Sequence, residues 1–157
     1  MQDDPSKLNK LGRTVELKYD EPNSSMLETF TNNYPAREYV IEFETKEVTS
    51  LCPKTGQPDF CHLRVSYVPN EKCIETKSLK LYLLAYRNHK TFMETMVNKI
   101  LDDLAESCKP RFMIVLGTYT SRGGIAGIIR TEYRDTSAAT EALGKLFRER
   151  PSGQTMH

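Results

Sequence analysis

Apolar and polar side chains alternate along several short stretches of this 157-residue chain, and one longer stretch repeats its apolar positions every three to four residues. Alternation is typical of half-buried strands, whereas the longer repeat is typical of an amphipathic helix. The pattern predicts a helix over 91–108, ended by Lys109-Pro110. It predicts four strands, over residues 39–44, 61–68, 112–119 and 125–133.

Three other stretches are less regular. In 78–88 the leucines at 79, 81 and 83 alternate as in a strand, but two of them also share a helical face with Tyr82 and Tyr86. Residues 1–35 are polar and predict an extended N-terminal arm with little regular structure. In the C-terminal tail, 136–157, the alanine-rich part 136–148 predicts a further helix. We expect a single domain over 1–157.

Composition excludes several classes of protein. With 22 basic and 21 acidic residues, the charge balance does not indicate a nucleic-acid or membrane partner. No apolar stretch is long enough for a bilayer, and the first residues lack the pattern of a signal peptide. We therefore expect a cytoplasmic protein with reduced cysteines. Zinc on Cys52, Cys61, His62 and Cys73 is conceivable, but this spacing matches no common ligand pattern, so no metal is expected.

The loop between the first two predicted strands carries a thiol and a carboxyl. Cys52 and Asp59 are seven positions apart, and two prolines with Gly56 shape the interval into a turn. A thiol and a carboxyl held by stiff backbone are the residue types of a nucleophile and its proton-handling partner. The loop alone also suits a simple hairpin whose cysteine has no chemical role.

A second run, Glu75 to Tyr82, favours the interpretation of Cys52 as a reactive residue. Together the two runs resemble the QueF family of NADPH-dependent nitrile reductases, which convert 7-cyano-7-deazaguanine to 7-aminomethyl-7-deazaguanine on the pathway to queuosine in tRNA. The family signature reads Glu, Ser or Leu, Lys, Ser or Ala, an apolar residue, Lys, Leu or Tyr, and an aromatic; Thr76 is the only departure here. The resemblance extends from about Gly12 to about Tyr133.

The resemblance implies an α+β tunnelling fold, or T-fold, and favours a helix for 78–88. The order is then two strands, two helices and two strands, as in a four-stranded antiparallel sheet with both helices on one face. Open sheet edges permit pairing between subunits. In the T-fold several subunits join their sheets into a barrel and purine sites lie at subunit interfaces, so a homo-oligomer is expected.

By resemblance, Cys52 is the nucleophile that adds to the nitrile and forms a covalent thioimide, and Asp59 is the residue that shuttles the proton. Two NADPH molecules then complete the four-electron reduction, without a metal. The substrate is a flat, neutral purine analogue whose donors require a carboxylate. Glu94 has that role in the family, with Glu75 as a second polar wall and the backbone around Ile74 and Thr76 lining the pocket. From the residues alone, Glu94 also suits a capping box with Thr91.

The resemblance assigns NADPH to Lys77, Lys80 and Arg122, most simply through its phosphates. The two lysines share a helical face, and Arg122 precedes Gly123-Gly124, which permit close approach of a phosphate. From the residues alone, they also suit a solvated basic face and a hairpin turn. No glycine-rich dinucleotide fingerprint is present. No direct nucleic-acid partner is expected.

One position departs from the family. Met93 stands where family members usually have a histidine that lines the substrate pocket, and a thioether cannot donate a proton. An archaeal branch forms the same thioimide but uses ammonia to make archaeosine, and Met93 keeps that amidinotransferase as an alternative. A non-catalytic purine-binding protein and a zinc cyclohydrolase on the same fold are further alternatives.

Overall fold

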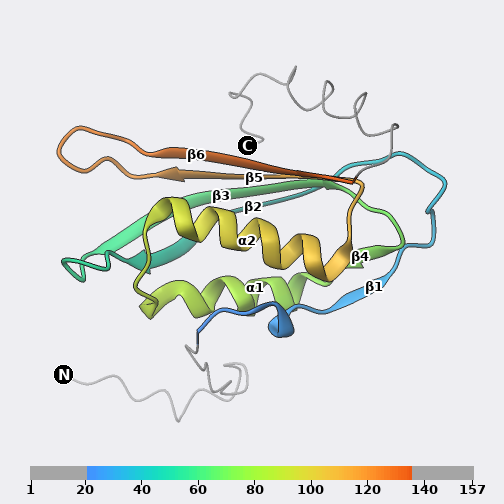
Figure 1. Ribbon diagram of the computed structural model, residues 1–157, viewed down its shortest axis with the longest axis horizontal. Coiled ribbons are helices and arrows are strands. Elements are labelled where there is room, and N and C mark those ends of the chain that lie inside the picture. The colour runs from blue at the N-terminus through green and yellow to red at the C-terminus, as the bar shows by residue number, and fades with distance from the viewer. Residues whose placement is uncertain (1–20, 136–157) are drawn as a thin grey trace, which may run out of the picture.

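The computed structural model describes residues 21–135, and its centre is one antiparallel sheet (Figure 1). The four strands lie in the order β2-β3-β5-β6. Their bounds are Ile41–Leu51 for β2, Pro58–Val68 for β3, Phe112–Tyr119 for β5 and Ile128–Arg134 for β6. All four predicted strands are therefore present, although the first two are longer than predicted.

Strand β2 contains a bulge, which interrupts the alternation from which its end was predicted. The register of β2 with β3 shifts between Thr45 and Val48. Before the shift the inward positions have odd numbers, such as Phe43, and after it Val48 and Ser50 are buried. A bulge changes the face to which the following side chains point. The alternation of apolar and polar residues is therefore broken at the bulge, and the predicted strand ends there.

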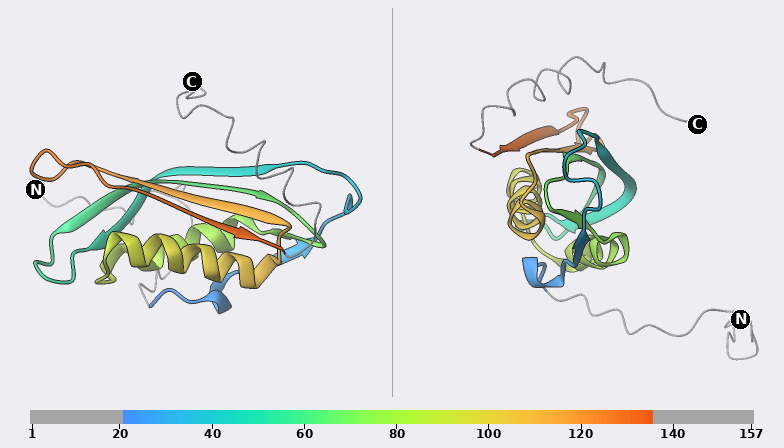
Figure 2. Two further views of the ribbon diagram at one scale, coloured as in Figure 1. Left: turned by 45° about the horizontal axis from the view of Figure 1, so that its top comes forward. Right: turned by 90° about the vertical axis from the view of Figure 1, so that its right-hand side faces the viewer.

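Two helices cover one face of this sheet (Figure 2). Helix α1 spans Thr76–Leu84 and continues as a short 3-10 segment, Ala85–Asn88. Helix α2 spans Met93–Cys108 and ends at Lys109, whose φ of 44° is left-handed. The α+β fold with two helices on one face of a four-stranded antiparallel sheet is thus confirmed.

The predicted capping box at the start of α2 is wrong. The helix begins two residues later, after Phe92, and the side chain at that N-cap makes no capping hydrogen bond. The Thr91 hydroxyl instead donates to the Phe92 carbonyl. The Thr91 amide donates to the Leu51 carbonyl at 3.0 Å, and this contact with β2 holds the chain extended where the pattern predicted a helix.

The predicted N-terminal arm contains two short regular elements in the part that the structure describes, residues 21–35. A 3-10 turn, Ser24–Met26, precedes strand β1, Thr29–Thr31, which pairs antiparallel with β4, Lys72–Ile74. These three-residue strands form a second, small sheet. The sheet depends on the pairing of distant segments and has no local sequence pattern. Residues 1–20 and the predicted helix 136–148 lie outside the described residues.

The core lies between the sheet and the helices. Leu63, Val65 and Tyr67 of β3 pack there with the apolar stripe of α2. Helix α2 lies so close to β5 that a Cβ added to Gly117 would be 2.7 Å from Val97 Cγ2. Apolar burial of this kind is the main force that fixes the helices on the sheet.

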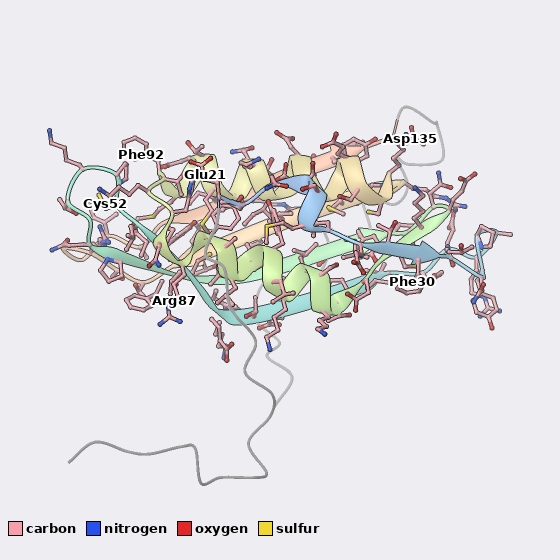
Figure 3. The ribbon with its side chains drawn as sticks, turned by 90° about the horizontal axis from the view of Figure 1, so that it is seen from below. Glu21, Phe30, Cys52, Arg87, Phe92 and Asp135 are labelled. Atoms are coloured by element: carbon pink, nitrogen blue, oxygen red, sulfur yellow. The ribbon has the colours of Figure 1, made fainter. Side chains whose placement is uncertain are left out.

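The molecule has two distinct ends. Figure 3 shows Cys52 and Phe92 at one end, and Phe30 and Asp135 at the opposite end. The β2–β3 turn and the start of α2 belong to the first end, whereas β1, β4 and the start of α1 belong to the other (Figure 1). The elements that carry the predicted site residues are therefore divided between the two ends.

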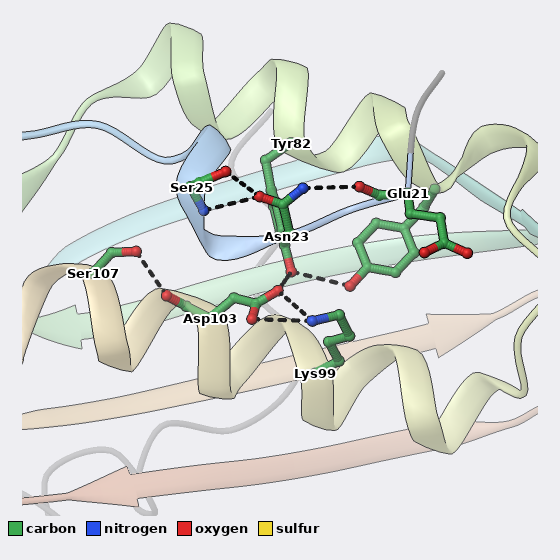
Figure 4. Close-up of polar contacts among 8 residues, drawn as sticks. Glu21, Asn23, Ser25, Tyr82, Lys99, Asp103 and Ser107 are labelled. Carbon is green, nitrogen blue, oxygen red and sulfur yellow. Dashed lines mark hydrogen bonds and ion pairs between the residues drawn. The ribbon is translucent and has the colours of Figure 1, made fainter. Parts of the chain in front are cut away.

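A buried polar network joins the two helices (Figure 4). The Tyr82 hydroxyl donates to Asp103 Oδ2 at 2.6 Å and lies 3.0 Å from the Tyr86 hydroxyl. Lys99 forms an ion pair with the same carboxylate at 3.1 Å. Burial, followed by the neighbouring Tyr86 and Asp103, raises the pKa of Tyr82. Each polar group in this network thus has a partner within the helical layer.

Candidate functional site

The turn between β2 and β3 is compact and holds Cys52 at its base. The Cys52 amide donates to the Gln57 carbonyl at 2.8 Å, and the Gly56 amide donates to the Cys52 carbonyl at 2.9 Å. Gly56 has a φ of 70°, a conformation that other residues rarely adopt. The side chain of Cys52 is half-buried, so the turn presents a thiol that is fixed and still accessible.

The surroundings of Cys52 favour its thiolate. Hydrogen bonds from the Thr55 hydroxyl and then from the amides of Thr55 and Lys54 lower the pKa of the Cys52 thiol to about 7. Arg122 adds a smaller contribution, and partial burial opposes these effects. The thiolate is the nucleophilic form of cysteine. Near neutral pH, Cys52 is therefore divided between thiol and thiolate.

Asp59 lies at the start of β3 and is only 5% exposed. Its Oδ1 forms an ion pair with Arg122 Nη2 at 2.7 Å. The same guanidinium donates to the Pro58 carbonyl at 2.8 Å and to the Gln57 carbonyl at 3.4 Å. Arg122 thereby connects the β5–β6 hairpin to the base of the Cys52 turn and supplies the counter-charge of a buried carboxylate.

The start of α2 is fastened beside the same turn. Leu51 and Lys90 form a parallel bridge, in which the Leu51 amide donates to the His89 carbonyl at 3.0 Å. The bridge places Glu94, in the first turn of α2, at the Cys52 end of the molecule. Glu94 is exposed and has no role in a capping box, so its carboxylate is available to a ligand.

Tyr119 of β5 lies among these elements. Its hydroxyl donates to the Met93 carbonyl at 3.4 Å. Burial raises the pKa of Tyr119, and the neighbouring Cys61, Asp59 and Glu94 raise it further. The charges of the two predicted site carboxylates, Asp59 for proton transfer and Glu94 for substrate, therefore both act on the same buried phenol.

The Met93 side chain packs on the second hairpin. It is half-buried, and a Cβ added to Gly127 would lie 3.3 Å from its sulfur. A thioether can fill such a gap against backbone but carries no proton. The family's histidine position is thus occupied by a packing residue.

The other predicted substrate residues lie at the opposite end. Ile74 is buried on β4, and its amide donates to the Tyr67 hydroxyl at 3.0 Å. Glu75 is the N-cap of α1 and accepts from the amides of Lys77 and Ser78 at 2.8 and 2.7 Å. These two amide hydrogen bonds lower the pKa of Glu75. Thr76 follows as the first, exposed residue of the helix.

Both predicted cofactor lysines are exposed on α1. Thr76 and Lys80 line a groove of about 400 Å³ between α1 and β2, whose other walls include Val48, Leu79 and Leu83. This volume lies within the range of small-molecule sites. Arg122, the third predicted cofactor residue, belongs instead to the Cys52 end and pairs with Asp59.

The two groups of residues cannot meet within one chain. Cys52 follows Leu51, which pairs with Pro58, the first residue of β3. Ile74 and Glu75 come shortly after the last residue of β3, at its other end. Eleven residues of strand span roughly 35 Å. The structure thus unites Cys52, Asp59, Arg122 and Glu94 at one end, and places Ile74, Glu75, Thr76, Lys77 and Lys80 apart from them.

Pattern reasoning missed two residues of the Cys52 end. Thr55 makes the largest contribution to the lowered pKa of Cys52, and its place inside the proline-glycine turn was the available signal. Tyr119 gave no signal, because an aromatic residue at the end of an apolar strand is ordinary core composition. Its nearness to the charges of Asp59 and Glu94 becomes visible only in the folded structure.

Neither a metal cluster nor a membrane-spanning helix is found among the described residues. Within residues 21–135, no group of three or more His, Cys, Asp or Glu side chains is arranged to hold a metal ion. Among the helices in that range, none has the length and apolar character needed to span a membrane.

Comparison with known proteins adds several close relatives. The NADPH-dependent 7-cyano-7-deazaguanine reductase of Nitrosococcus oceani is 51% identical over 114 residues, which cover 73% of this chain and 88% of the relative. The protein of the same name from Magnetococcus marinus is 48% identical over 122 residues, covering 78% and 94%. That from Bacteroides thetaiotaomicron is 48% identical over 119 residues, covering 76% and 78%.

A solved structure shares the fold. The apo form of an archaeosine synthase QueF-Like superposes with a TM-score of 0.57, covering 62% of this chain and 96% of its own. At 17% identity this likeness concerns the fold alone. The tunnelling fold expected from the sequence is thereby confirmed.

A family model brings these findings together. The model described as QueF-like protein matches residues 58–138, which include Asp59, Glu94 and Arg122. The match covers just over half of the chain, and relatives about half identical extend it on the N-terminal side. By this match and these relatives, the chain belongs to the QueF-like protein family.

Proposed function

We propose that this protein is an NADPH-dependent nitrile reductase that converts 7-cyano-7-deazaguanine to 7-aminomethyl-7-deazaguanine. The observation that carries the proposal is the Cys52 thiol, whose pKa is lowered to about 7 in a turn that also holds a buried carboxylate. The relatives that are about half identical carry the name of this activity. An ordinary surface cysteine would need no such surroundings.

The residues support covalent activation of the nitrile. The Cys52 thiolate adds to the nitrile carbon and gives a thioimide, a better hydride acceptor than the nitrile. The nitrile nitrogen must gain a proton in this step. Asp59 receives the thiol proton and passes it to that nitrogen, while Arg122 holds the carboxylate in place. Glu94 accepts hydrogen bonds from the donors of the purine ring.

The chain also offers suitable residues for NADPH. Lys77 and Lys80 are exposed cations, and Gly123 and Gly124 have positive φ values of 55° and 83° with no heavy atom within 4 Å of an added Cβ. Cations and open glycine backbone are the usual means of binding phosphates. When bound, NADPH supplies the hydrides of the reduction. Lys77, Lys80 and Arg122 would hold it.

We further propose that the complete site lies between two copies of this chain. Cys52 and Glu75 lie toward opposite ends of β3, an eleven-residue strand that spans roughly 35 Å, so one chain cannot present both to one small substrate. Strands β2 and β6 form the open edges of the sheet. Pairing of such edges between copies would bring opposite ends of neighbouring chains together.

The direct test is NADPH oxidation by the purified protein, with and without 7-cyano-7-deazaguanine, beside Cys52→Ala. We expect substrate-dependent oxidation of two NADPH per amine formed, and none in the variant. Wild-type protein without oxidation would contradict the reductase. If it nevertheless gained the mass of the substrate on Cys52, the amidinotransferase suggested by Met93 would replace it.

The shared site has its own test. Cys52→Ala and Glu75→Gln are each expected to be inactive or strongly impaired; the glutamine keeps an oxygen for the α1 cap. After mixing and reassembly, roughly a quarter of the interfaces would combine the two intact halves. Recovery of activity on mixing would support the interface. Two variants that stay inactive together, although each binds wild-type subunits, would contradict it.

A further inference from the structure

Ser50 has a buried hydroxyl that the chemistry above does not use. Its side chain is 0% exposed. Within residues 21–135, its Oγ is the buried side-chain polar atom that has no hydrogen-bond partner. Buried polar groups are nearly always paired, since an unpaired one destabilises the fold. A hydroxyl in this condition calls for an explanation.

The strand register places this hydroxyl beside the predicted proton carrier. Ser50 of β2 is the direct partner of Asp59 of β3. Side chains of directly opposite residues point to the same face, with their Cβ atoms about 4.5–5.5 Å apart. The ladder continues for one further pair, where the Cys52 amide donates to the Gln57 carbonyl. Ser50 and Cys52, two positions apart, therefore also share that face.

In the resting structure the Asp59 carboxylate is held by Arg122, and the Ser50 hydroxyl has no hydrogen-bond partner. The ionised carboxylate is bound by the guanidinium of Arg122 at 2.7 Å. When the carboxyl takes a proton, it becomes neutral and the attraction to the guanidinium weakens. The new O–H then needs an acceptor in a place where Asp59 is almost fully buried. A serine hydroxyl can both accept and donate.

We propose that Ser50 is a positioning residue, whose hydroxyl holds the Asp59 carboxyl by a hydrogen bond while that carboxyl carries the proton from Cys52 to the nitrile nitrogen. This inference rests on the proposed nitrile chemistry. It adds a residue that acts through Asp59 and that touches neither the substrate nor the cofactor.

The step balances without an oxidant or a reductant. The Cys52 S–H bond breaks, and its proton forms the O–H bond of Asp59. The sulfur forms a bond to the nitrile carbon, and the carbon–nitrogen triple bond becomes a double bond. The proton then moves from Asp59 to the nitrogen, which restores the carboxylate and its pairing with Arg122. Ser50 keeps its own proton throughout.

The test measures thioimide formation alone, in a single turnover without NADPH, by intact-protein mass. We expect Ser50→Ala to slow this step about 10- to 100-fold, a part of the full effect of general acid–base catalysis. Its melting temperature should equal or exceed that of wild type, because the lost hydroxyl had no partner. The control is Ser66→Ala on β3, whose hydroxyl donates to Glu42 at 3.0 Å; it should leave the rate unchanged.

A double-mutant cycle separates positioning from a general effect. If Ser50 acts through Asp59, then Ser50→Ala should cause no further slowing in an Asp59→Asn background. Equal slowing in both backgrounds, a wild-type rate in Ser50→Ala, or a lower melting temperature for that variant would overturn the inference. If wild-type protein forms no adduct, the nitrile chemistry itself fails and this inference fails with it.

Discussion

The molecule contains two buried aspartates whose surroundings differ in kind. Asp103 is 7% exposed and bonds to Tyr82 and Lys99 of the helical layer. Asp59 is 5% exposed, and its ion-pair partner, Arg122, belongs to a distant hairpin. The first network is complete within the helices, whereas the second adjoins an accessible thiol and an unpaired hydroxyl.

This difference shows how equal burial can serve opposite purposes. A fully paired buried network fixes one arrangement of the chain and offers nothing to a ligand. A buried carboxylate whose partners can be exchanged is able to gain and lose a proton. We therefore assign stability to the Asp103 network and chemistry to the Asp59 network.

The largest effect is expected for Asp59→Asn. An amide cannot take the thiol proton, so the rate of thioimide formation should fall about 10²- to 10⁴-fold. The measurement is single-turnover adduct formation at neutral pH, with circular dichroism as the control for folding. A variant with near wild-type rate would remove Asp59 from the proton path and end the contrast between the two aspartates.

Asp103→Asn should show the opposite pattern. It weakens the hydrogen bond from Tyr82 and the ion pair with Lys99, and hydrogen bonds to charged groups contribute about 1.5–3 kcal/mol. We expect the free energy of unfolding to fall by about this amount in urea, while the rate of adduct formation per folded molecule stays unchanged. Tyr82→Phe, which removes the donor, should give a similar loss. A slowed reaction in either variant would contradict the division.

Helix α1 itself has a structural and a chemical side. It carries Tyr82 on its buried side and the predicted cofactor residues Lys77 and Lys80 on its exposed side, and we consider the changes Lys77→Ala and Lys80→Ala. Loss of a phosphate contact should raise the KM for NADPH about tenfold and spare adduct formation. Lys46→Ala, an exposed lysine on β2, is the matched control. Loss of adduct formation would show that the lysines serve the nitrile step instead.

The smallest effect concerns pH. Because the pKa of Cys52 is about 7, alkylation by iodoacetamide should accelerate as pH rises through 7, when thiol becomes thiolate. Thr55→Val removes the hydroxyl that contributes most to the lowered pKa, so its midpoint should move upward, toward the ordinary value of cysteine near 8.5. A midpoint unchanged by Thr55→Val would contradict that role.

The sequence predicted the fold better than the contacts within the site. Alternation and helical periodicity found the four long strands and α2, because packing against one core dictates those patterns. The bulge after Thr45 and the pairing of β1 with β4 escaped prediction, since both depend on residues distant in sequence. The family signature named Glu75 but gave no indication that it caps α1.

The candidate site shows the same limit. Cys52 and Asp59 could be chosen from their turn, because both lie within eight residues of sequence. The pairing of Asp59 with Arg122 could not, since it joins positions far apart in the chain. The division of predicted residues between two ends of the molecule also required the three-dimensional arrangement.

The parallel bridge between Leu51 and Lys90 has a consequence for motion. Two hydrogen bonds cross this bridge in opposite directions. The Leu51 amide donates to the His89 carbonyl, and the Thr91 amide donates to the Leu51 carbonyl. Opening of either bond would move the Cys52 turn away from the start of α2, and this movement would strain the other bond. Hydrogen exchange at these two amides should therefore proceed at a common rate, as one cooperative opening unit. In that case the thiol of Cys52 and the carboxylate of Glu94 would move as parts of one element, although 41 residues of sequence lie between them.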